Sequence, residues 1–326
     1  MSATMFSILQ QWHLLVQNKH YPIDLLDIDN EHVDITGVSP THLMDFPLLI
    51  NSSDPHILQR FCDIMSWVSK AQYLLFSSIY ELERRTIDAL RVKFCFPIYT
   101  IGPAIPFFKL EDDSCLSPRK INEPNYMHWL NCQPNRSVLY ISFGSFLSVS
   151  GVQMDEITAG LNSSGVRFLW VVRGETSCSS KLEEVCGNNM WGMLVPWCDQ
   201  LRVLSHPSVG GFLTHCGWNS VCEGLFAGVP SLTFPLGVDQ MTNSKLIEED
   251  WKIGWRVKKL AEEENLVSRE AIREYVVKFM DIESNEGKQM RKRVNEVQEK
   301  CEDAIAKDGS SEINIKSFIR NISQCS

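Results

Sequence analysis

The strongest constraint on the fold of this chain is a regular alternation of short apolar runs and helix-length segments in its second half. Helix-length segments such as 153–165 and 220–229 separate the runs. The runs themselves fit buried strands at 137–143, 167–173, 192–197, 209–215, 230–235 and 253–257. Apolar runs that alternate with helices are typical of βαβ units, so the pattern predicts a parallel, doubly wound α/β sheet.

The first third of the chain is less regular and offers only one or two convincing strands, at 71–83 and within the proline-containing run 96–108. A charged stretch with Ser and Pro follows it and is the best linker candidate. The tail after Ser268 has a helical pattern, with 284–309 as a long solvated helix. We therefore expect a partial N-terminal domain at 1–108, a linker at 109–124, a C-terminal domain at 125–305, and a last helix at 306–326 that packs back on the N-terminal domain.

Composition narrows the classes of protein that fit. The net charge of -9 over 326 residues argues against a nucleic-acid-binding surface, which needs a clustered basic face. The 11 cysteines form an odd number without a CxxC pair, which indicates a reduced set in the cytoplasm. The start lacks a basic leader and no apolar run reaches the length of a membrane span, so we expect neither a signal peptide nor a membrane partner. We expect a monomer.

A polar motif interrupts the apolar pattern where the fourth run ends. Residues 212–225 read FLTHCGWNSVCEGL, so a buried strand passes into a helix through polar residues. His215 lies at the strand end, Gly217 permits a tight turn, and Asn219 and Ser220 are good N-cap types where the helix begins. A helix N-terminus presents N–H groups and partial positive charge, and it binds phosphate without a basic side chain.

Polar side chains near other strand ends extend this motif. Glu223 lies one helical turn after Asn219, where its carboxylate can accept hydrogen bonds from sugar hydroxyls. Trp197 and Gln200 follow the preceding strand and suit the face and the edge of a nucleobase. Further candidates are Gly144 and Ser145 for phosphate, and Asp239 and Gln240 for a second sugar.

Each of these residues alone also has a structural interpretation. A strand-end His more often packs than binds, a Trp fills a core about as often as it binds, and Asn-Ser at a helix start often only caps it. A helix Glu is commonly a solvated charge. The combination of a base platform, a phosphate-binding helix end and sugar acceptors on one sheet edge favours a nucleotide-sugar pocket.

Residues 197–240, from WCDQL to PLGVDQ, resemble the 44-residue donor-binding signature of plant UDP-dependent glycosyltransferases. The leading Trp, the HCGWNS core, the Glu, the GVP and the closing DQ stand at the family's spacing. Segments 71–83, 96–108, 137–150 and 243–257 extend the resemblance to nearly the whole chain. It implies the GT-B fold, with two Rossmann-like domains of which the N-terminal one is incomplete.

The resemblance also implies a role for each matching residue. The leading Trp of the family stacks on uracil and its Gln meets uracil or ribose, which assigns Trp197 and Gln200. Glu223 holds the ribose hydroxyls, and a closing Gln, here Gln240, accompanies glucose preference. The residues expected around the diphosphate are Ser145, His215, Gly217, Asn219 and Ser220, and those expected to face the sugar are Trp218, Asp239 and Gln240.

Two departures from the family pattern matter. The family's catalytic base is a His held by an Asp, and the opening MSATMFSIL resembles a segment beyond both, so we expect this dyad upstream of Met1 and assign no catalytic residue. The histidines at 13, 20, 32, 42 and 56 do not follow a strand in the family's context. Val238 differs from the residues common before the closing Asp, which predicts looser sugar selection.

The resemblance implies a UDP-glycosyltransferase that transfers a hexose, with glucose favoured, to a hydroxyl of a small-molecule acceptor. The implied mechanism is inverting and metal-independent, with UDP-glucose as co-substrate and no cofactor. The alternative is a truncated, catalytically impaired chain that acts only as a UDP-sugar binding module. A nicotinamide-dependent oxidoreductase is disfavoured because no GxGxxG follows an early strand.

Overall fold

A computed structural model of the chain describes residues 1–11, 32–42, 45–46, 63–105, 124–145, 149–172, 191–257 and 266–324. The chain divides into two compact units. The sheet unit comprises Ile105–Leu236 and Ile247–Glu296, and the terminal unit comprises Met1–Ala104, Gly237–Leu246 and Val297–Ser326. Most of the predicted linker lies outside the described residues, as do His13, His20 and His56. Within the described ranges, no helix is both long and apolar enough to cross a bilayer.

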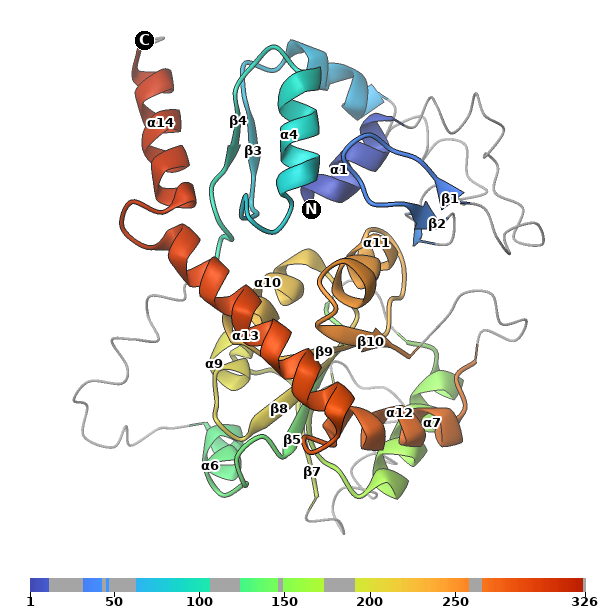
Figure 1. The fold of residues 1–326 in the computed structure, drawn as a ribbon. Helices are drawn as coiled ribbons and strands as arrows, with labels where there is room; N and C mark the ends of the chain where they lie inside the picture. Colours follow the sequence, from blue (N-terminus) through green and yellow to red (C-terminus); the bar gives the residue numbers. More distant parts are fainter. Residues whose placement is uncertain are drawn as a thin grey trace. The chain divides into compact units, whose positions relative to one another are not determined.

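The sheet unit is built around a six-stranded parallel sheet in the order β10-β9-β8-β5-β6-β7 (Figure 1). Each strand lies within one of the predicted apolar runs, which confirms the predicted doubly wound α/β sheet. The strands are β5 (Val138–Ser142), β6 (Arg167–Val171), β7 (Gly192–Val195), β8 (Val209–Thr214), β9 (Ser231–Thr233) and β10 (Gly254–Arg256).

Apolar side chains of β5 face both sides of the sheet, because successive strand residues point in opposite directions. Leu139 and Ile141 enter the core with the apolar faces of α7 (Gly151–Ser164) and α12 (Arg269–Met280), which lie side by side in Figure 1. Val138 and Tyr140 enter the opposite core, with α6 (Asn125–Asn131) and α9 (Gln200–Leu204). The sheet is therefore covered on both faces, as buried parallel strands require.

Local sequence sets the ends of the helices that cover the sheet. Ser150 caps α7, since its Oγ accepts a hydrogen bond from the Gln153 N–H at 3.2 Å, and Ser268 caps α12 in the same way. Gly165 ends α7 with a φ of 68°, a left-handed conformation that glycine adopts at little cost.

The terminal unit contains short strands and helices from distant parts of the sequence. β3 and β4 pair in parallel, and β1 pairs with β2 in antiparallel fashion. Its strands are β1 (His32–Val33), β2 (Thr41–His42), β3 (Leu74–Phe76) and β4 (Ile98–Thr100). Its helices include α1 (Ala3–Gln10), η3 (Val68–Lys70), α4 (Arg84–Lys93), α11 (Gln240–Lys245), which η4 (Leu246–Asp250) follows, and α14 (Ser310–Gln324).

Polar contacts between distant segments join these elements. The buried Glu83 carboxylate accepts hydrogen bonds from the backbone N–H groups of Ala3 and Thr4, at 3.0 and 2.8 Å, in the first turn of α1. An acidic side chain at a helix start satisfies N–H groups that have no acceptor within the helix. Asn314 of α14 donates to the Thr100 carbonyl at the end of β4, at 3.0 Å.

The predicted solvated helix at 284–309 corresponds to α13 (Asn285–Ile305), but it is not solvated all round. One face is buried, with apolar residues three or four positions apart: Met290, Val294, Val297, Cys301 and Ala304. The charged composition concealed this stripe, because the remaining positions carry most of the Glu, Lys and Arg residues. The helix is therefore amphipathic.

Candidate functional site

The order of strands in the sheet unit places a topological switch between β5 and β8. From this pair, β6 and β7 extend in one direction and β9 and β10 in the other. In open α/β sheets, ligands bind outside the carboxyl ends of the strands at such a switch. Gly144 and the exposed Ser145 follow β5 there, and His215 and Gly217 follow β8.

The half-buried ring of His215 lies between two glycines. A Cβ added to Gly144 would come within 2.4 Å of His215 Nε2, and one added to Gly217 within 2.5 Å of the same atom. Gly144 also has a φ of 75°, which disfavours other residues. The two glycines therefore let the loops after β5 and β8 close around the imidazole.

The role predicted for Gly217 in a tight turn requires correction. Gly217 has a φ of -58°, which any residue can adopt, and the left-handed residue of the turn is Cys216, with a φ of 67°. The Cys216 N–H donates to Thr214 Oγ1 at 3.1 Å, which supports this conformation. A glycine is needed at 217 because of its closeness to His215.

The helix α10 (Trp218–Phe226) begins one residue earlier than the predicted N-caps. Gly217 occupies the N-cap position and no side chain caps the helix there, whereas Asn219 and Ser220 lie within its first turn. The first-turn N–H groups of an α-helix have no acceptor within the helix. The beginning of α10 therefore keeps the capacity to bind an anion.

Gln200, Ser220 and Glu223 form one hydrogen-bonded cluster. Gln200 Nε2 donates to Ser220 Oγ at 2.9 Å and to Glu223 Oε2. The half-buried Glu223 has a pKa raised above its ordinary value, first by burial and then by the charge of Asp199, with the Gln200 hydrogen bond opposing both. A carboxylate held in this way is a strong acceptor for sugar hydroxyls.

The path that brings Gln200 to this cluster is not evident from the sequence. β7, which precedes Gln200, is an edge strand and is separated from β8 by β6 and β5. The chain returns after β7, and α9 packs against both β8 and α10. The side chains meet because of this return, and not because their strands are neighbours.

Tyr140 completes the cluster and was missed by sequence reasoning. Its hydroxyl donates to Gln200 Oε1 at 3.2 Å and lies 3.3 Å from Cys198 Sγ. Burial raises the pKa of the Tyr140 phenol well above its usual range, so it stays protonated. In the sequence, Tyr140 is only one apolar-type residue of a buried strand, and nothing local marks its hydroxyl.

The two tryptophans of the motif lie in different environments. Trp197 is 63% exposed, which leaves its indole accessible for stacking. Trp218 is 5% exposed, and its ring centroid lies 6.5 Å from that of Trp251. The expected contact of Trp218 with a sugar stays a prediction.

Asp239 and Gln240 belong to the terminal unit, at the beginning of α11. Asp239 Oδ2 accepts a hydrogen bond from Asn243 Nδ2 at 3.0 Å. The buried Gln240 accepts one from the Gly237 N–H through Oε1 at 3.1 Å, which closes the turn around Val238. Their expected role at the sugar also stays a prediction.

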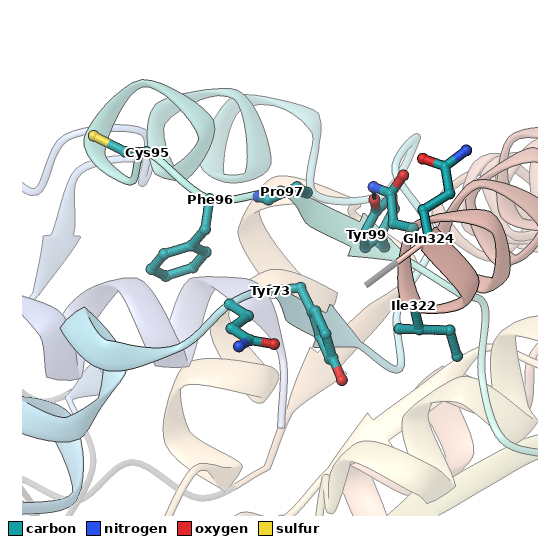
Figure 2. A pocket seen from close by; sticks show the side chains of 9 residues that line it. Tyr73, Cys95, Phe96, Pro97, Tyr99, Ile322 and Gln324 are labelled. Atoms are coloured by element: carbon teal, nitrogen blue, oxygen red, sulfur yellow. Dashed lines mark hydrogen bonds between the residues drawn. The ribbon is translucent and has the colours of Figure 1, made fainter. Parts of the chain in front are cut away.

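A cavity of about 590 Å³ lies in the terminal unit and holds none of the predicted site residues (Figure 2). Tyr73, Phe96 and Pro97 line it just before β3 and β4, and Tyr99 and Ile322 complete its apolar wall. It lies at the amino ends of these strands, whereas ligand sites of parallel sheets lie at the carboxyl ends. It is therefore not a candidate donor site.

Within the described residues, no three His, Cys, Asp or Glu side chains gather in a way that could hold a metal ion. The expectation of a metal-independent reaction rests on the resemblance and stays a prediction.

Comparison with known proteins shows what the chain resembles. The model of the family described as UDP-glucoronosyl and UDP-glucosyl transferase matches residues 57–275. The chain is 47% identical to UDP-glycosyltransferase 87A2 of Arabidopsis thaliana over 323 residues, which are 99% of this chain and 69% of that protein. It is 45% identical to UDP-glycosyltransferase 87A1 of the same plant, over 99% of this chain and 72% of that protein.

Solved structures of plant glycosyltransferases share the fold. Phytolacca americana UGT2 complexed with UDP-2fluoro-glucose and pterostilbene has a TM-score of 0.82 at 28% identity, over 98% of this chain and 68% of that chain. Medicago truncatula UGT71G1 complexed with UDP-glucose has a TM-score of 0.81 at 27% identity, over 98% of this chain and 69% of that chain. The α/β architecture is thus that of GT-B plant glycosyltransferases.

Proposed function

Because this chain belongs to the UDP-glucoronosyl and UDP-glucosyl transferase family, we propose that it transfers glucose from UDP-glucose to a hydroxyl of a small-molecule acceptor. By family it is an enzyme, a plant UDP-glycosyltransferase that uses small acceptors. The observation that supports the donor site most directly is the Gln200, Ser220 and Glu223 cluster beside the uncapped start of α10.

The donor nucleotide is proposed to bind at the carboxyl ends of β5 and β8. The exposed indole of Trp197 stacks on uracil, and Gln200 with Glu223 holds the ribose. The diphosphate binds at the beginning of α10, where N–H groups and the helix dipole favour negative charge. The groups proposed to surround it are Ser145, His215, Gly217, Asn219 and Ser220.

Glucose is the proposed sugar, with Trp218, Asp239 and Gln240 facing it. Two kinds of observation support this choice. Gln240 closes the donor signature, and two solved relatives are complexed with UDP-glucose or UDP-2fluoro-glucose. Polar side chains such as Asp239 and Gln240 suit the hydroxyls of a hexose.

The proposed reaction is an inverting displacement at the anomeric carbon. The acceptor oxygen forms a bond to this carbon as the bond to the β-phosphate oxygen breaks, and UDP leaves with the electron pair. The start of α10 and His215 stabilise the charge that develops on UDP. The acceptor proton passes to a general base, which we do not assign among the described residues, and the step needs no metal in this proposal.

The test is glucosyl transfer by the purified chain from UDP-glucose to a panel of phenols and aliphatic alcohols. Mass spectrometry detects the glucoside, and NMR gives its anomeric configuration. A β-glucoside formed from the α-linked donor supports the proposal. UDP binding without a glucoside on any acceptor would contradict glucosyl transfer, and an α-glucoside would contradict inversion.

A further inference from the structure

We propose that Tyr140 is a positioning residue that fixes the side-chain amide of Gln200 for the ribose of the donor nucleotide. This inference rests on the proposed donor site. It adds to that site a buried residue that was not among the site residues predicted from the sequence. Tyr140 itself is not proposed to touch the nucleotide, because its side chain acts through Gln200.

The geometry places Gln200 between two different kinds of partner. On one side, Tyr140 Oη lies 3.2 Å from Gln200 Oε1, and on the other, Gln200 Nε2 lies within hydrogen-bond distance of Glu223 Oε2 and 2.9 Å from Ser220 Oγ. The oxygen of the amide therefore has one partner and the nitrogen has two others.

Chemistry allows only one orientation of this amide. An ionised Glu223 only accepts hydrogen bonds, so the NH2 end of Gln200 must face it, and Oε1 must face Tyr140. The phenol then uses its single proton on Gln200, and the Cys198 thiol, 3.3 Å from Tyr140 Oη, donates to the phenol oxygen. The hydrogen bonds run in one direction, from Cys198 through Tyr140 and Gln200 to Ser220 and Glu223.

This direction prepares the groups that meet the ligand. Ser220 Oγ accepts from Gln200, which leaves its own proton available for a phosphate oxygen. Glu223 uses Oε2 for Gln200, which directs Oε1 to a ribose hydroxyl. A reversed amide would place Gln200 Oε1 against the carboxylate, where the two acceptors repel each other.

The hydroxyl of Tyr140 can be removed without removing its packing. The side chain is 1% exposed, and its ring stacks on Phe212 with centroids 5.1 Å apart. Phe at position 140 keeps this stacking but leaves Gln200 Oε1 without its buried donor. The amide then loses the contact that opposes its rotation away from Glu223.

The experiment measures UDP and 2′,3′-dideoxy-UDP affinity by calorimetry for the wild type and for Tyr140→Phe. The second nucleotide lacks both ribose hydroxyls. We expect Tyr140→Phe to raise the Kd of UDP roughly tenfold, about 1.4 kcal/mol. We expect the preference for UDP over the dideoxy nucleotide to narrow from roughly tenfold or more to less than about threefold.

Tyr126→Phe is the matched control. The buried Tyr126 belongs to the same apolar cluster, and its hydroxyl accepts a hydrogen bond from the Asp199 N–H at 3.2 Å. The Gln200 amide is hydrogen-bonded to Tyr140, Ser220 and Glu223. This variant should keep the preference for UDP. Thermal unfolding of each sample shows that the variants are folded.

The outcomes separate this inference from the proposed function. Absence of UDP binding by the wild type removes the donor site and this inference with it. If the wild type binds UDP but Tyr140→Phe weakens the binding of both nucleotides equally, or changes the binding of neither, the proposed function stands and the role of Tyr140 is overturned. If the preference for UDP over the dideoxy nucleotide narrows equally in Tyr126→Phe, the role of Tyr140 is overturned as well, since loss of any hydroxyl in this cluster would then have the same effect.

Discussion

His215 packs so closely on Gly144 that a single methyl group at position 144 would lie within 2.4 Å of its Nε2 atom. Gly144 follows β5 and His215 follows β8, so this contact joins the two loops at the switch of the sheet. The position of the imidazole therefore depends on the absence of a side chain at Gly144, which lies 71 residues earlier in the sequence.

Gly144→Ala should weaken UDP binding more than roughly tenfold, because the new methyl group displaces the His215 ring from the proposed diphosphate site. The φ of 75° should add a loss of about 1–2 kcal/mol in the free energy of unfolding. Calorimetry with UDP and a denaturant titration measure the two effects.

Gly165→Ala is the control that separates the effect of backbone strain from the effect of the clash with His215. Gly165 has a similar φ of 68°, but a Cβ there would meet nothing within 4 Å. This variant should lose about 1–2 kcal/mol in the free energy of unfolding through backbone strain alone and keep the affinity of the wild type for UDP. Equal affinities in the two variants would show that His215 does not need its present position.

Gly217→Ala tests the same ring from its other side. Its φ of -58° suits alanine, so Gly217→Ala carries no left-handed backbone strain, whereas the new methyl group meets His215 Nε2 at 2.5 Å. We expect the Kd of UDP to rise roughly tenfold, since the ring must move. An unchanged Kd would argue against contact of His215 with the nucleotide.

The raised pKa of Glu223 predicts opposite pH trends for stability and for binding. Burial makes ionisation of Glu223 more costly in the folded chain than in the unfolded chain. The stability that Glu223 contributes is therefore fully present below its unfolded pKa, near the ordinary 4.5. It is lost as the pH rises through the raised pKa of the folded chain. UDP affinity should rise over the same interval, because ribose hydroxyls donate to the Glu223 carboxylate in the proposed complex. Calorimetry at several pH values measures the binding trend.

Glu223→Gln is the control for this trend. UDP ionises in the same way with both proteins, so the difference between them isolates the carboxylate. The variant should bind UDP more weakly at neutral pH and lack the part of the pH dependence that Glu223 contributes. Parallel pH curves for the two proteins would exclude Glu223 from the ribose site.

Much of the sheet was predictable, because strands buried on both faces form continuous apolar runs that stand out between helices. The order of those strands was not predictable in the same way. β7 lies at an edge, far from β8 in the sheet, and only the return of the chain through α9 brings Gln200 to Glu223. Such contacts depend on packing between segments that are distant in the sequence.

The motif predicted that His215, Ser220 and Glu223 lie where β8 passes into α10, and they do, while their role in binding stays a prediction. The structural reasons for this placement were not predictable. Cys216 takes the left-handed conformation expected of Gly217, and the cap expected at Asn219 or Ser220 lies at Gly217. A sequence gives residue types at the turn, but backbone angles arise from the whole β8–α10 connection.

Val238 is a β-branched residue in a left-handed conformation, with a φ of 55°. Asn tolerates this conformation far better, so Val238→Asn should raise the free energy of unfolding by about 0.5–1 kcal/mol. The exposed Val152 lies in α7, where Val and Asn have similar helix propensities, and Val152→Asn should change stability by less than about 0.5 kcal/mol. Denaturant titration compares them, and equal effects would contradict strain at Val238.

The most direct test of the donor site is calorimetric UDP binding to the wild type, to Trp197→Ala and to Trp191→Ala. Both tryptophans are exposed, at 63% and 43%, and both belong to the sheet unit, but only Trp197 is proposed to stack on uracil. Stacking of a base on an aromatic ring contributes about 1–3 kcal/mol, so Trp197→Ala should lose roughly five- to hundredfold in affinity, while Trp191→Ala binds as the wild type does. Wild-type affinity in Trp197→Ala, or no UDP binding by the wild type, would contradict the donor site described here.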